Sequence, residues 1–228
     1  MKKNSLINLL PPKDQDDFYS KAHLVELNLS QVIGEAGTPS TEVYFPSNCF
    51  ISVIQRIEGA SSIEVGIIGR EGLLGSEIAL GVSTNSFGSL VQGPGNAWKI
   101  DAKDFISQIK KSLAFTDIIN SYIAVRLSQL GLSIACEHFH EIGPRLAKWL
   151  LMSQDRAQSD SFFMTHEFIS LMLGVRREGI TGAAVDFRRR SLIDYHRGEM
   201  KILNRVALKA EACSCYQKNR KIYTSIFQ

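Results

Sequence analysis

The sequence predicts an α+β protein with three parts: a β-rich N-terminal domain, one long helix, and a helical C-terminal domain that includes a short β-hairpin. Two observations lead to this fold class. Apolar residues follow a period near two up to about residue 101, and a period near 3.6 beyond it. Glycine and proline also interrupt the first part at short intervals. We place the three parts at residues 1–112, 113–141 and 142–228.

Six short segments of the first part are rich in β-branched and aromatic residues, which favour strands. They cover residues 22–29, 41–45, 50–56, 62–68, 89–91 and 97–100. Many short strands at this spacing are typical of a sandwich or a barrel.

The long helix is predicted from an apolar stripe with steps of four, four, three and four residues. Its members are Ile119, Ile123, Leu127, Leu130 and Ile134. Such a stripe can pack on the chain's own β domain, or pair with a second copy as a short coiled coil, or do both. We expect dimerisation through it, because the stripe is too long to leave in water.

Composition narrows the class of protein. Hydrophobic residues make up 44% and charged residues 21% of the chain, which suits a packed core. We find no stretch that approaches the ~20 apolar residues of a membrane-spanning helix. The expectation is a cytoplasmic protein with no membrane partner.

The cysteines Cys49, Cys136, Cys213 and Cys215 form no CxxC pair, so reduced thiols are expected. Cys213 and Cys215 could hold a metal or sense redox state, but small buried residues are the preferred interpretation. Cys136, His138 and His140 also offer metal ligands, and Cys136 shares a helix face with His140. Because a site there requires the helix to end early, we favour packing roles and predict no metal.

Positive charge gathers at the C-terminal end. Residues 141–228 carry 15 basic and 9 acidic residues, a net +6, whereas residues 1–140 carry 11 and 14, a net −3. A polyanion would be attracted to the basic part by Coulomb forces and by counterion release.

A helix-turn-helix is predicted within this basic part. Thr165 is a good N-cap for a helix whose Phe168, Leu171 and Met172 face a core, and Gly174 ends that helix. A second helix starting at Arg176 would bury Ile180, Ala184 and Phe187 and turn Arg177, Glu178 and Thr181 outward. Outward polar residues at the start of a recognition helix reach base edges in the major groove. An ordinary helical hairpin is the alternative, but it has no reason to place arginines at both ends of one helix.

A β-hairpin wing is predicted after the second helix. Residues 192–195 and 200–203 form two short strands around a turn that contains Gly198. Arg197 and Lys201 are then placed to meet phosphates. A surface hairpin with chance basic residues is the alternative.

The chain resembles the Crp/Fnr family of transcription regulators along nearly its whole length. The specific match covers residues 145–152 and 165–184; residues 43–46 and 69–72, with Gly75, match the family's β domain more loosely. The resemblance implies a cyclic-nucleotide-binding-like β-roll (a double-stranded β-helix, jelly-roll-like), a dimerisation helix near residues 115–137 and a winged helix-turn-helix. It also implies a homodimer on an inverted-repeat DNA site, with RNA polymerase as a further partner.

The family's base-reading positions fall at Arg177 and Glu178, and a third, often arginine, falls at Gly182. The complete predicted DNA-binding set is Thr165, His166, Arg176, Arg177, Glu178, Thr181, Arg188, Arg189, Arg190, Arg197 and Lys201.

No cofactor is predicted. Family members that bind cyclic AMP hold its phosphate with an Arg-Ser pair, but residues 86–89 contain no arginine here, and Gly75 is followed by serine rather than glutamate. The candidate loop for another small molecule comprises Gly75, Ser76, Glu77, Phe87, Gly88 and Ser89. Iron-sulfur members carry clustered N-terminal cysteines, and this chain has none before Cys49.

A DNA-binding regulator is therefore the leading hypothesis. The alternative is a cyclic-nucleotide or other small-molecule sensor whose β-roll retains nucleotide binding. An enzyme ranks last, because no GxSxG, HExxH or P-loop pattern stands out. The sequence specifies neither the effector, the target genes, nor the direction of regulation.

Overall fold

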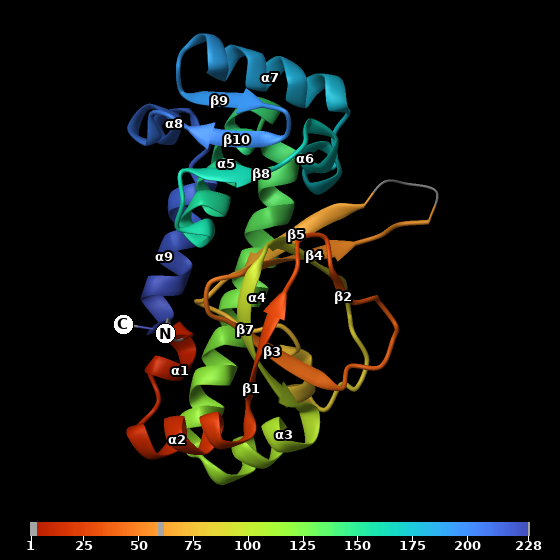
Figure 1. Ribbon diagram of the computed structural model, residues 1–228, viewed down its shortest axis with the longest axis vertical. Helices are drawn as coiled ribbons and strands as arrows, with labels where there is room; N and C mark the ends of the chain where they lie inside the picture. The colour runs from red at the N-terminus through yellow and green to blue at the C-terminus, as the bar shows by residue number, and fades with distance from the viewer. Residues whose placement is uncertain (1–3, 59–61, 228) are drawn as a thin grey trace. The chain divides into compact units, whose positions relative to one another are not determined.

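The computed structural model describes residues 4–58 and 62–227 (Figure 1). The chain forms two compact units. Of the described residues, one unit comprises 4–53 and 67–127 with Phe227, and the other comprises 54–58, 62–66 and 128–226. The long helix α4, Leu113–Phe139, supplies residues to both units.

The β-rich part contains two sheets. One has the strand order β1-β7-β3, with β1 His23–Leu27, β3 Glu42–Pro46 and β7 Gly95–Asp101. The other has the order β2-β6-β4-β5, formed by Val32–Gly34, Gly88–Gly93, Phe50–Gln55 and Ile63–Ile68. All six predicted strands are present, and the α+β fold class is confirmed. The short strand β2 was not predicted, and β6 and β7 extend until only Pro94 separates them.

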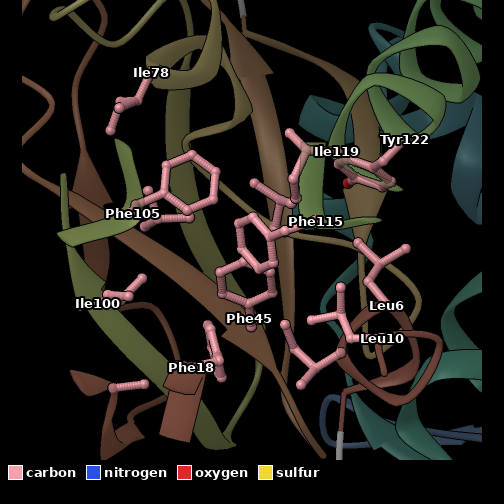
Figure 2. Close-up of a cluster of buried hydrophobic side chains, with 14 residues drawn as sticks. Leu6, Leu10, Phe18, Phe45, Ile78, Ile100, Phe105, Phe115, Ile119 and Tyr122 are labelled. Atoms are coloured by element: carbon pink, nitrogen blue, oxygen red, sulfur yellow. The ribbon is translucent and has the colours of Figure 1, made fainter. Parts of the chain in front are cut away.

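Aromatic rings fill the core of the N-terminal unit (Figure 2). Phe105 packs edge-on against Phe45 at 6.2 Å and against Phe115 at 5.7 Å between ring centroids. The helices α1, Ser5–Asn8, and α2, Pro12–Lys21, add Leu6 and Phe18 to this core, Leu10 in the link between them adds a further side chain, and α3, Ala102–Lys111, adds Phe105. The first two helices were not predicted. Pro12 starts α2, at a position where proline is favoured.

By length and composition, α4 is the one helix among the described residues that could cross a membrane. The expectation that no stretch approaches such a length was wrong for this helix. Its first half instead places Phe115, Ile119 and Tyr122 in the aromatic core. This packing explains part of the apolar composition.

The C-terminal part contains α5 Ile142–Ala157, α6 His166–Leu173, α7 Arg177–Arg189, α8 Arg205–Glu211 and α9 Cys215–Phe227. Its sheet has the order β8-β10-β9, from Ser161–Phe163, Glu199–Ile202 and Ile193–His196. Strand β8 was not predicted. Met172 is buried as predicted, but Leu171, also expected in the core, is 38% exposed, because the helix buries Ile169 and Leu173 instead.

Candidate nucleic-acid interface

The helix-turn-helix forms where the sequence predicts it, between α6 and α7. The Thr165 hydroxyl accepts a hydrogen bond from the Phe168 amide at 3.0 Å and so caps α6. Gly174 ends the helix with a φ of 60°, a left-handed conformation that favours glycine. The second helix was predicted to start at Arg176. Arg176 is instead the N-cap of α7, and Arg177 is the first helical residue.

The two faces of α7 differ as predicted. Ile180, Ala184 and Phe187 are buried, which fixes the orientation of the helix. Arg177, Glu178 and Thr181 are exposed near its N-terminal end. Gly182, at the third expected reading position, is also exposed, and no atom would contact a side chain added there. The start of α7 therefore offers a charged surface with a gap at Gly182.

His166 connects three elements of the domain. It is the first residue of α6, its ring stacks on Tyr195 of β9 at 4.3 Å, and its Nδ1 lies 3.2 Å from Oγ1 of Thr181 on α7. Burial and the charge of Arg177 lower the pKa of the His166 imidazole, so the neutral ring is favoured. Thr165 and His166, both in the predicted DNA-binding set, thus have partners within the protein: Thr165 caps α6, and His166 joins α6 to α7 and the wing.

The three arginines at the far end of α7 are all paired with carboxylates. Arg188 lies 3.0 Å from Asp194, and Arg189 lies 2.8 Å from Asp186. Arg190 contacts Asp186 at 3.2 Å and holds both carboxylate oxygens of Glu211 at 2.5 and 3.0 Å. Hydrogen bonds from Arg190 and Arg189 lower the pKa of Asp186. These contacts set the three arginines apart from those at the start of the helix.

The wing is a tight hairpin of β9 and β10, with β8 on its other edge (Figure 1). His196 pairs with Glu199, so Arg197 and Gly198 form a two-residue turn, and their φ values of 48° and 87° are those of a type I′ turn. A side chain at Gly198 would meet the Phe163 ring at 2.6 Å. Within the described residues, Arg176, Arg177, Arg197 and Lys201 are exposed and in no ion pair. Their charges are therefore available to a ligand.

The apolar stripe of α4 divides into two sets. Ile119 is buried in the N-terminal core and Ile123 packs against it, so the prediction that these two form an outward seam was wrong. Leu127 and Ile134 are 66% and 73% exposed, and Leu130 is half-buried. The exposed stripe, which we call the α4 seam, consists of Asn120, Ala124, Leu127, Gly131, Ile134 and His138. Its steps of four and three alternate, which is the repeat of a coiled coil.

The residues of the candidate ligand loop lie in different elements. Gly75, with a φ of 93°, caps a 3₁₀ helix at Ser76–Leu80 that includes Ser76 and Glu77, whereas Ser89 lies in β6 and bonds to the Gly34 carbonyl at 3.5 Å. A pocket beside Gly75 has a volume of about 40 Å³, room for a few water molecules. Its lining contains Glu42 and Tyr44 but no arginine, and of the predicted loop it contains Gly75 alone.

Comparison with known proteins extends these observations. The Crp-like helix-turn-helix domain family matches residues 144–211. A putative crp/fnr-family regulator from Eubacterium rectale is 19% identical, with a TM-score of 0.70 over 92% of this chain and 98% of its own. FixK2 from Bradyrhizobium japonicum is 12% identical, with a TM-score of 0.72 over 85% and 98% of the two chains. A CRP-family transcriptional regulator from Thermus thermophilus is 17% identical, with a TM-score of 0.71 over 83% and 97%. No curated protein sequence matches the chain.

Proposed function

We propose that the chain is a cytoplasmic homodimer that binds an inverted-repeat DNA site and regulates transcription. The premise of this proposal is that the chain belongs to the Crp/Fnr regulators, which its helix-turn-helix domain and its fold support. RNA polymerase is its proposed protein partner through the family resemblance, and no catalytic activity is proposed.

The observation that carries this proposal is the exposed start of α7. Arg177 has the fork geometry to bind O6 and N7 of guanine, and Glu178 can accept a hydrogen bond from N4 of cytosine. Both are exposed, whereas Ile180, Ala184 and Phe187 anchor the opposite face. Arg197 and Lys201 of the wing are exposed, and we propose that they meet phosphates. Base contact and backbone contact are thus assigned to different elements.

The α4 seam supports the homodimer. Leu127 and Ile134 are seven residues apart, and a coiled coil places such residues at the same position of successive heptads. Large exposed apolar side chains on one helix face are costly in water and mark an interaction surface. Two copies of α4 packed through the seam would bury them and present two recognition helices to DNA.

Cyclic AMP is not proposed as the effector. Residues 86–89 lack the arginine that would neutralise its phosphate, and the lining of the pocket beside Gly75 contains no arginine either. Cyclic AMP and cyclic GMP should therefore give no heat of binding in calorimetry at concentrations near those in cells. Micromolar binding of either nucleotide would contradict this and favour the sensor hypothesis.

Charge placed in the α4 seam tests the dimer. Leu127→Asp combined with Ile134→Asp should give a monomer by light scattering, because four carboxylates would face one another in each dimer. Leu80→Asp combined with Ile57→Asp is the matched control, since these residues are 63% and 59% exposed but lie outside the seam. The control should remain dimeric. A dimer that persists in the seam variant would place the interface elsewhere.

A further inference from the structure

Three buried cysteines and one histidine meet beside the helix-turn-helix. Cys136 lies in the last turn of α4, and His140 follows the end of that helix. Cys213 lies between α8 and α9, and Cys215 is the first residue of α9. Their three Sγ atoms and the histidine ring nitrogen all lie within 4.8 Å of one another. From the sequence, Cys136 and His140 were considered apart from Cys213 and Cys215, and no metal was predicted at either place. The fold brings all four together, although Cys136 and Cys213 are 77 residues apart.

The spacing of these atoms matches the ligands of one tetrahedral ion. Zn–S bonds of about 2.3 Å and Zn–N bonds of about 2.0 Å place two thiolates roughly 3.8 Å apart, and a thiolate and a ring nitrogen roughly 3.5 Å apart. The observed distance is 3.6 Å between Sγ of Cys136 and Sγ of Cys213, and 3.6 Å between Sγ of Cys215 and Nδ1 of His140. Atoms this close have no space for the several irons and sulfides of an iron-sulfur cluster.

From this geometry we propose that Cys136, His140, Cys213 and Cys215 bind one zinc ion, which fastens the start of α9 to the end of α4. Four protein ligands leave no position for water, so the site is structural rather than catalytic. On binding, three thiols lose their protons to solvent and the ring nitrogen supplies its lone pair. Three thiolates with Zn²⁺ leave one net negative charge. The ammonium group of Lys148, 3.1 Å from Sγ of Cys136, offsets it.

The site is joined to the helix-turn-helix by direct contacts. Glu137, the neighbour of Cys136, accepts a hydrogen bond from the buried guanidinium of Arg145 on α5, and Arg145 also donates to the carbonyl of Leu173, the last residue of α6. On the other side, the Cys213 amide donates to the Pro144 carbonyl at 3.3 Å. The ion would therefore hold two contacts of α5 in place. We expect its loss to loosen the support of the helix-turn-helix.

Metal analysis of the purified full chain tests the site. Protein prepared in the presence of a thiol reductant should contain one zinc per chain by mass spectrometry, and Cys215→Ser and His140→Ala should each lose most of it. Two matched controls should keep their zinc. Cys49→Ser removes the buried cysteine outside the cluster, and His138→Ala removes an exposed histidine two residues from Cys136 and His140.

A cobalt titration of the metal-stripped natural chain gives an answer that does not depend on the folding of variants. Co²⁺ should bind one per chain, show the visible and thiolate charge-transfer absorption of tetrahedral cobalt, and be displaced by zinc. The proposal fails if the chain takes up neither Zn²⁺ nor Co²⁺, if Cys49→Ser loses as much metal as Cys215→Ser, or if cobalt is six-coordinate. A Cys136–Cys213 disulfide in the reduced preparation would also overturn it.

Discussion

The two ends of α7 carry similar charges but differ in their contacts. At the start of the helix, Arg177 is exposed and, within the described part of the chain, in no ion pair. At the far end, Arg190 is held by Asp186 and by both oxygens of Glu211. A basic residue on a recognition helix is thus not automatically a DNA contact. Its charge is available to DNA only where no neighbouring carboxylate forms an ion pair with it; otherwise it links elements of the protein.

The largest expected effect of this difference is on base recognition. Arg177→Ala should weaken binding to the preferred site by roughly 1–3 kcal/mol and relax the preference at one base position per half-site. Arg189→Ala, at the far end of the same helix, is the control and should leave base preference unchanged. Titrations against the best site and its single-base variants measure both. Uniform loss for Arg177→Ala with intact preference would contradict the assigned readout.

A smaller effect should separate wing contacts from structural ion pairs. Arg197→Ala should weaken all DNA sequences about equally and lower the slope of log K against log salt by about one, the value for one lost phosphate contact. Arg190→Ala should keep the salt slope and lower the melting temperature, because it breaks the contacts to Asp186 and Glu211. Binding at several salt concentrations and thermal unfolding give both quantities. A lower slope for Arg190→Ala would mean that Arg190 leaves its ion pairs and contacts a phosphate in the DNA complex.

The smallest expected effect concerns the gap on the reading face. Gly182 lies within α7 with no atom near a side chain added there, so Gly182→Ala should stabilise the domain by roughly 0.5–1 kcal/mol. Gly179→Ala is the matched control on the same helix. Its added carbon would lie 2.6 Å from Cδ1 of Ile142, so the end of that side chain must shift, and we expect a smaller gain than at Gly182. Denaturant unfolding measures both changes, and an equal or larger gain for Gly179→Ala would contradict the expected packing difference.

Local signals in the sequence were sufficient for much of the fold. Glycine and proline spacing located six strands, and the Thr165 cap and Gly174 located the helix-turn-helix. Strand β8 escaped because it has three residues and pairs with β10, far along the chain. Ile119 was misassigned because apolar periodicity reveals a buried face without revealing its partner, which is the chain's own aromatic core.

The candidate site was predictable to a similar degree. The exposed residues of α7 follow from the helical period once Ile180, Ala184 and Phe187 are taken as buried. The ion pairs of Arg188 and Arg190 do not follow from the helical period, because Asp194 and Glu211 come from other elements. The cluster of Cys136, His140, Cys213 and Cys215 was hidden for the same reason. Its two pairs meet only through folding.

Selection of genomic DNA fragments by the natural chain tests the central claim most directly. The account predicts enrichment of one inverted repeat whose half-sites are about 10–10.5 base pairs apart, or a multiple of that spacing, since a two-fold dimer presents one α7 to each. Enrichment should be lost in the Leu127→Asp, Ile134→Asp variant. Failure of the natural chain to enrich any sequence, or enrichment of a single unrepeated motif, would contradict the account.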